Sequence, residues 1–134
     1  MKGTYVLLIK LGRSRRMKIG RLGSVSFRKG FFCYVGSGMN SLEKRIERHL
    51  RKEKKEHWHI DRFLEKAEIY RVIYSEGGKE CELAKGLAER FDYVKNFGSS
   101  DCKCRSHLFF SGKNFERDVF KIFRKIGLDP VVWG

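Results

Sequence analysis

The feature that most constrains the fold is an apolar run near the start of the chain. Residues 4–11 read Thr-Tyr-Val-Leu-Leu-Ile-Lys-Leu, and β-branched and aromatic side chains in such a run are typical of a buried strand. A second run of this kind, Phe-Phe-Cys-Tyr-Val at residues 31–35, is closed by Gly36, Ser37 and Gly38. Between the two runs lie a basic turn at residues 13–16, a short returning strand at 17–19 and a glycine-punctuated loop or hairpin at 20–30. The opening of the chain is therefore predicted to be an antiparallel meander.

Helical periodicity dominates the rest of the chain. A helix capped by Asn40 or Ser41 should follow, and its apolar face is formed by Leu42, Ile46, His49 and Leu50. Further helices are predicted at about 57–67, 79–91 and 114–126, strands at 69–74 and 107–110, and an ordered loop at 96–104. Since 134 residues can bury one sizeable core but not two, we expect a single α+β domain, residues 1–134. Its centre should be a small, mainly antiparallel sheet flanked by helices.

The charge balance indicates an anionic partner. Lys and Arg number 30 against 16 Asp and Glu, which gives a net charge of +14. An extended anion is the simplest partner for such an excess, and nucleic acid is the commonest extended anion. A membrane surface would require a terminal basic helix with a continuous apolar face, which the sequence lacks. The basic residues expected to bind nucleic acid are Lys44, Arg48, Arg51, Lys52, Lys55, Arg13, Arg15 and Arg16. The plainer alternative for the run at 44–55 is a solvated helix face.

Composition also indicates a compartment and a source. No apolar run is long enough to cross a membrane, and the first residues lack the features of an export signal. The four cysteines, Cys33, Cys81, Cys102 and Cys104, are therefore expected to be reduced thiols in a cytoplasmic protein. Abundant Lys, Arg and Glu, together with the absence of the thermolabile amide Gln, favour a hot-living source.

Residues 34–49 carry a pattern with a known counterpart. A strand ends in Tyr-Val-Gly, a short turn with Ser and Asn follows, and a helix then presents Arg45 and His49. This segment resembles the second half of the motif of the GIY-YIG endonuclease superfamily, and Gly3-Thr4-Tyr5 resembles a degenerate first half. The motifs at residues 57–61 (His-Trp-His-Ile-Asp) and 97–108 (Phe-Gly-Ser-Ser-Asp-Cys-Lys-Cys-Arg-Ser-His-Leu) narrow the resemblance. They are similar to an uncharacterised branch of that superfamily, a small domain found alone or fused to endonuclease III.

The resemblance implies a GIY-YIG-like fold and a metal-dependent endonuclease that hydrolyses DNA phosphodiester bonds in repair, with a repair glycosylase such as endonuclease III as a partner. It implies that Tyr5 or Tyr34 handles the proton of the nucleophile, with His49 as a helper. Arg45 would hold the phosphate through its planar donor fork, and Glu82 would anchor Mg²⁺ or Mn²⁺. An unperturbed tyrosine has a pKa near 10, so nearby cations must lower it before the tyrosine can act as a base.

The chain departs from the superfamily pattern at two places. Tyr5 and Tyr34 are much further apart than the paired tyrosines of the superfamily, and an added N-terminal hairpin that carries Arg13, Arg15, Arg16 and Lys18 would account for the separation. Glu80 and Glu82 lie on the expected helix, but neither is cleanly in register, and Lys85 could occupy the place of the metal ligand. In that case the chain would be a catalytically inactive nucleic-acid-binding module that acts with a repair enzyme. Tyr5 and Tyr34 would then be ordinary strand residues and Arg45 a surface ion-pair residue.

A second set of polar residues comes from the two specific motifs. Its members are His57, His59, Asp61, Cys102, Cys104 and His107. These side chains offer enough nitrogen and sulfur for a tetrahedral zinc, although Cys-x-Cys is tighter than the usual ligand spacing. We favour the alternative, in which they cap loops through hydrogen bonds; His59 and Asp61 could equally line the pocket near Arg45. Zinc would make a third function possible, a zinc-stabilised domain that binds proteins.

Overall fold

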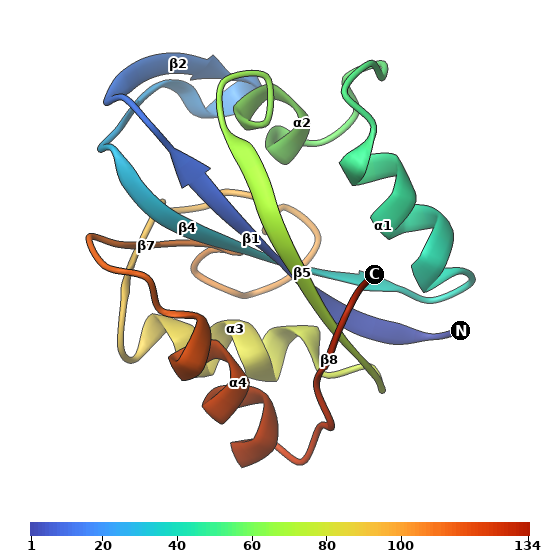
Figure 1. Cartoon of the computed structure of the whole chain (residues 1–134). Coiled ribbons are helices and arrows are strands. Elements are labelled where there is room, and N and C mark those ends of the chain that lie inside the picture. The colour runs from blue at the N-terminus through green and yellow to red at the C-terminus, as the bar shows by residue number, and fades with distance from the viewer.

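The structure, a computed structural model, describes the whole chain, residues 1–134. Its centre is a six-stranded sheet of order β6-β7-β4-β1-β5-β8 (Figure 1). β1 (Gly3–Leu11) lies between β4 (Gly30–Gly38) and β5 (Glu68–Glu76) and pairs antiparallel with both. Every residue of β1 except Lys10 is buried, so the predicted buried strand is confirmed. Short strands complete the sheet: β7 (Leu108–Ser111) and β6 (Asp92–Tyr93) beyond β4, and β8 (Val131–Val132) beyond β5.

The N-terminal hairpin forms a sheet of its own. β2 (Arg15–Ile19) and β3 (Gly23–Phe27) pair only with each other, and a 3-10 helix, η1 (Gly20–Leu22), joins them. The predicted hairpin is present, but the prediction that the opening of the chain forms an antiparallel meander is wrong, because β1 pairs with β4 and not with β2. The reason is that β4 and β5 occupy both edges of β1. Met17, Ile19 and Phe27 fix the hairpin to the core.

Helices cover both faces of the sheet. Four are present: α1 (Leu42–Leu50), α2 (His59–Phe63), α3 (Glu80–Ala88) and α4 (Glu116–Lys125). Alternate residues of β1 face opposite ways: Tyr5 and Leu7 pack in a core with α1, α2 and the hairpin, whereas Val6 and Leu8 pack in a core with α3 and α4. Figure 1 shows α3 and α4 together on one side of the sheet, away from α1 and α2. The prediction of an α+β fold on a mainly antiparallel sheet is confirmed. No helix is both long and apolar enough to span a bilayer.

The helix that follows β4 agrees with its sequence signals in most respects. The hydroxyl of Ser41 accepts a hydrogen bond from the backbone N–H of Lys44 at 3.2 Å, so Ser41 is the cap. Leu42, Ile46 and His49 are buried as predicted, but Leu50 is exposed because it is the last residue of α1, where the chain turns away from the sheet. α2 is also shorter than the helix predicted at 57–67.

Candidate functional site

The candidate site lies where β4 extends past its neighbour. β7 pairs with the stretch from Phe31 to Tyr34, and the N–H of Val35 donates to the carbonyl oxygen of His107 at 2.9 Å, so the last residues of β4, from Gly36 to Gly38, form an edge of the sheet. Side chains from both helical layers reach this edge. We call the resulting group the β4-edge site; its members are Tyr5, Tyr34, Ser37, Arg45, His49 and Glu80.

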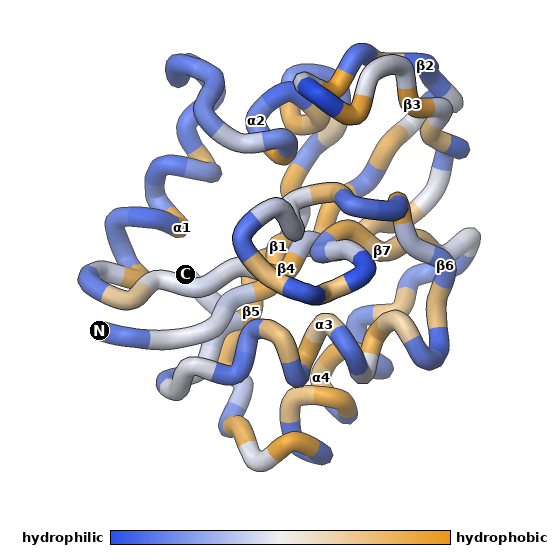
Figure 2. The backbone as a smooth tube through the Cα atoms, turned by 180° about the vertical axis from the view of Figure 1, so that it is seen from behind, coloured by the Kyte–Doolittle hydropathy of each residue, from blue (hydrophilic) through white to orange (hydrophobic).

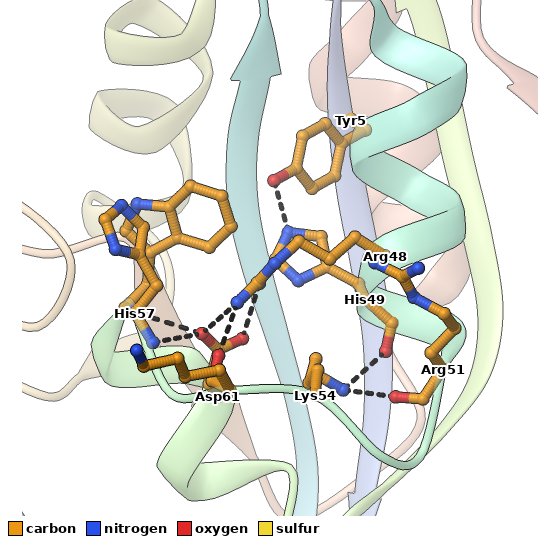
Figure 3. Close-up of polar contacts among 9 residues, drawn as sticks. Tyr5, Arg48, His49, Arg51, Lys54, His57 and Asp61 are labelled. Carbon is orange, nitrogen blue, oxygen red and sulfur yellow. Dashed lines mark hydrogen bonds and ion pairs between the residues drawn. The ribbon is translucent and has the colours of Figure 1, made fainter.

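A buried hydrogen bond joins Tyr5 of β1 to His49 of α1. The hydroxyl oxygen of Tyr5 lies 2.6 Å from Nε2 of His49, as Figure 3 shows. Gly36 stands opposite Tyr5 in the strand register, and a Cβ at Gly36 would lie 2.3 Å from the Tyr5 hydroxyl oxygen. The glycine of the Tyr-Val-Gly sequence therefore makes room for the tyrosine ring that bonds to His49.

Burial keeps both members of this pair uncharged at neutral pH. Burial raises the pKa of Tyr5 well above its usual value, nearby Tyr34 raises it further, and Arg45 acts in the opposite direction. Burial also lowers the pKa of His49 to about 4, although Asp61 opposes the shift. Arg45 alone therefore does not activate Tyr5 as a base, contrary to the role expected of nearby cations. Since His49 is neutral, its Nε2 can accept the hydroxyl proton of Tyr5.

Tyr34 shares these surroundings. Its ring centroid lies 6.1 Å from that of His49, and the Tyr5 ring lies 5.4 Å from the same imidazole. Burial, followed by the negative charge of Glu80, raises the pKa of Tyr34 above its usual range. A Cβ at Gly98 would lie 3.3 Å from the Tyr34 hydroxyl, so the loop at 94–107 packs directly against this group. The two tyrosines named from the sequence thus flank one histidine.

Ser37 connects Arg45 on α1 to Glu80 on α3. Nη1 of Arg45 donates to the carbonyl oxygen of Ser37 at 2.6 Å, and the Ser37 hydroxyl donates to Oε1 of Glu80 at 3.1 Å. The guanidinium also lies 5.0 Å from the ring centroid of Trp58. Nη1 makes the one hydrogen bond of this guanidinium, which leaves donors of the planar fork for an anion.

Glu82, the metal ligand named from the sequence, lies elsewhere. It is exposed and lines a hollow of about 520 Å³ between α3 and α4, together with Lys85 and Lys121. Two residues along a helix correspond to a rotation of about 200°, so Glu80 and Glu82 face different sides of α3. The carboxylate that lies in the β4-edge site is therefore Glu80, and both Glu82 and Lys85 lie outside that site.

Asp61 caps α2 and pairs with Arg48. Its carboxylate accepts from the backbone N–H groups of His57 and Trp58, both at 2.9 Å, and from two nitrogens of Arg48, both at 3.0 Å (Figure 3). Burial raises the pKa of Asp61, but the hydrogen bonds from Arg48 and from the two backbone groups outweigh it and hold the pKa below its ordinary value. The hydrogen-bonded interpretation fits this motif. The guanidinium of Arg48, a residue expected to bind nucleic acid, is thus already paired with Asp61. The guanidinium carbons of Arg48 and Arg45 lie 4.4 Å and 5.0 Å from the ring centroid of Trp58.

Three members of the second motif meet at a different place. Cys102, Cys104 and His107 gather with Cys81, from the first turn of α3, and their sulfur and nitrogen atoms all lie within 4.8 Å of one another. We call these four residues the Cys3His cluster, and it could bind a metal ion. His59 does not join it: its Nδ1 accepts from the N–H of Gly98 at 3.1 Å. The six residues grouped from the sequence therefore divide between two places, and Cys81 was missed.

The comparison with protein families covers nearly all of this structure. Residues 4–128 match the family model described as a domain of unknown function, DUF123. The chain belongs to the DUF123 family. The DUF123 match includes every residue of the β4-edge site and of the Cys3His cluster. No curated protein and no solved structure matches the chain.

The basic side chains expected to bind nucleic acid are mostly free of ion pairs in this DUF123 member. Those exposed to solvent are Lys44, Arg51, Lys52 and Lys55 on and after α1, and Arg13 and Arg16 at the hairpin; Arg15 is half-buried. Figure 2 shows α1 and the segment after it as mainly hydrophilic. Lys54 acts differently, since its ammonium group donates to the carbonyl oxygens of His49 and Arg51 and so closes the end of α1 (Figure 3).

Proposed function

We propose that the chain is a metal-dependent endonuclease that hydrolyses DNA phosphodiester bonds in repair, of the GIY-YIG type that its sequence resembles. The observation that carries the proposal is the link through Ser37. It holds a guanidinium, Arg45, and a carboxylate, Glu80, at one strand edge beside the Tyr5–His49 pair. Phosphodiester hydrolysis requires these kinds of group: a cation for the phosphate, a ligand for a metal and an acceptor for the proton of the nucleophile.

Arg45 is suited to hold the scissile phosphate. A planar guanidinium binds phosphate oxygens through two donors at once, which fixes orientation as well as charge. The hydrogen bond to Ser37 and the contact with Trp58 limit the positions that the Arg45 side chain can take. The phosphate would thus be placed at the edge of β4, within reach of both layers of helices.

Glu80 fits Mg²⁺ or Mn²⁺. Its side chain retains 32% of its full exposure, and only one of its oxygens accepts from Ser37. Mg²⁺ in nucleotide-processing sites is commonly held by one or two carboxylates and keeps several waters, which matches a single half-exposed glutamate. When bound, such an ion supplies charge stabilisation at the phosphate.

The Tyr5–His49 pair can move a proton without a free phenolate. As Tyr5 takes a proton from the attacking water, its own hydroxyl proton passes to Nε2 of His49, 2.6 Å away. Burial disfavours the imidazolium that forms, and the carboxylate of Asp61 favours it. The pair therefore performs the role that a phenolate would perform if its pKa were lowered.

The deep burial of the tyrosines favours a second candidate, a nucleic-acid-binding module that does not cut. Tyr5 and Tyr34 are only 2% and 8% exposed, as expected of residues that simply pack between strand and helix. In this case the net charge of +14 would serve binding alone, beside a repair enzyme such as endonuclease III. A protein-interaction domain accounts less well for that charge.

Cleavage assays distinguish the two candidates. The full chain would be incubated with Mg²⁺ or Mn²⁺ and labelled duplex, flap, junction, abasic and single-stranded substrates, and binding would be measured on the same samples. We expect at least one substrate to be cut and a chelator to stop the reaction. If the chain binds these substrates but cuts none of them in a metal-dependent way, the second candidate, the nucleic-acid-binding module that does not cut, is supported.

A further inference from the structure

The Cys3His cluster joins two parts of the chain that are distant in sequence, α3 and the loop at 94–107 that leads into β7. Cys81 belongs to the first turn of α3, Cys102 and Cys104 to the loop at 94–107, and His107 directly precedes β7. Three sulfurs and one imidazole nitrogen within 4.8 Å of one another form a donor set typical of structural zinc. We propose that these four residues bind one zinc ion, which fastens the loop to α3.

The imidazole of His107 is already oriented as a ligand. Its Nδ1 lies 3.1 Å from the carbonyl oxygen of Val35, and because a carbonyl only accepts, Nδ1 must carry the ring proton. The lone pair is then on Nε2, which lies 3.2 Å from Sγ of Cys102. Metal-ligating histidines are commonly held in this way, with the second ring nitrogen donating to a carbonyl or a carboxylate. Glu80 adds a carboxylate oxygen 3.6 Å from Nδ1.

The loop needs a connection of this kind at its tip. Its base is closed by backbone hydrogen bonds from Val94 to Leu108, from Asn96 to Arg105 and from His107 to Phe97. Between residues 99 and 104 the only backbone hydrogen bond runs from Cys102 to Ser99, at 3.4 Å. Both loop cysteines of the cluster lie in this stretch, so a zinc ion would fix the part that the backbone leaves loosely held.

The chemistry of the donors selects the metal. Thiolates are soft ligands that favour zinc over Mg²⁺, and four protein ligands fill a tetrahedral shell with no open position for substrate. The ion is therefore structural. It is distinct from the ion proposed at Glu80, where the donors are oxygens.

Metal content of the full chain tests the site. Protein purified under reducing conditions without chelator should contain about one equivalent of zinc. Replacement by Co²⁺ should give tetrahedral d–d bands and thiolate-to-metal charge-transfer bands. Cys104→Ser should lose most of the metal, while Cys33→Ala, a change at the buried cysteine outside the cluster, should retain it.

A second measurement does not depend on whether Cys104→Ser folds. An organomercurial reagent added to the native wild-type chain should release zinc in proportion to the thiols it modifies. Well under about half an equivalent of metal, together with no tetrahedral Co²⁺ spectrum, would overturn the proposal, as would a disulfide among the three cysteines in reduced preparations. DNA cleavage is not a readout here, so failure of the proposed endonuclease activity and failure of the zinc site are separate results.

Discussion

The hydroxyl oxygen of Tyr5 lies 2.6 Å from Nε2 of His49, and 44 residues of sequence separate the two. This contact fixes α1 against the central strand of the sheet. Both groups are buried and neutral, so the same hydrogen bond that supports packing also provides a path for a proton. The stability of the fold and the proposed chemistry are therefore coupled at His49.

The titration of His49 should make stability depend on pH. Its pKa is about 4 in the folded chain against an ordinary 6.5. As pH falls through this window the unfolded chain takes up a proton that the folded chain does not, so the free energy of unfolding falls by about 3 kcal/mol. His49→Gln keeps an acceptor for Tyr5 and removes the titration. The free energy of unfolding, measured with denaturant between about pH 7 and about pH 4, should depend less steeply on pH in this variant than in the wild type. The difference in slope should correspond to about one fewer proton taken up on unfolding.

The matched control is His57→Gln, because His57 is exposed. It should retain the wild-type pH dependence of stability. Equal slopes for the wild type and His49→Gln would show that the folded chain does not hold His49 neutral.

Gly36→Ala should disrupt the packing of the Tyr5 ring against β4. The added Cβ would lie 2.3 Å from the Tyr5 hydroxyl oxygen, and both residues belong to paired, buried strands. We expect the free energy of unfolding to fall by about 1–3 kcal/mol. Gly12→Ala is the control, since nothing lies within 4 Å of that Cβ. If the two variants had equal unfolding midpoints, the close packing of Tyr5 on Gly36 would be wrong.

Asp61→Asn should destabilise the chain through Arg48. The carboxylate is 1% exposed and the guanidinium 20%, so the substitution leaves a charge without its partner in a largely buried position. We expect a loss of about 2–4 kcal/mol, less than for a fully buried pair because Arg48 keeps some contact with water. The exposed pair of Arg62 and Glu65 offers the comparison: Glu65→Gln should cost less than about 1 kcal/mol. Similar losses for both variants in denaturant unfolding would argue against a structural role of Asp61.

Binding to DNA should depend on the basic residues after α1. Reversing three exposed charges, Arg51, Lys52 and Lys55, to Glu should weaken binding and reduce the slope of log affinity against log salt by about one per lost phosphate contact. Arg48 is left unchanged because its pair with Asp61 would be broken. The control reverses three exposed charges on α4, Lys121, Arg124 and Lys125, and so has the same net charge. Equal effects of the two triple variants, measured by titration at several salt concentrations, would contradict a binding face at α1.

The sequence predicted much of the fold because its periodic signals are local. The run at 4–11 and the cap at Ser41 each depend on neighbouring residues, and so does the order Tyr34, Arg45, His49. The choice between Glu80 and Glu82 depends instead on how α3 is rotated against the sheet, which packing decides. Cys81 is a single cysteine in a helix, and no spacing rule connects it to the Cys-x-Cys of a distant loop. β8 is only two residues long and exists because β5 offers it a free edge.

The most direct test of the proposed endonuclease compares Glu80→Gln with Glu82→Gln. Both lie in the first turn of α3, and both variants remove one negative charge, but only Glu80 is bonded to Ser37 in the β4-edge site. With saturating Mg²⁺ and a substrate that the wild type cuts, we expect Glu80→Gln to lower the cleavage rate by about 100-fold or more. Glu82→Gln should cleave like the wild type, and both should bind DNA with nearly unchanged affinity. Loss of cleavage in Glu82→Gln with retention in Glu80→Gln, or no metal-dependent cleavage by the wild type on any substrate, would contradict the proposal.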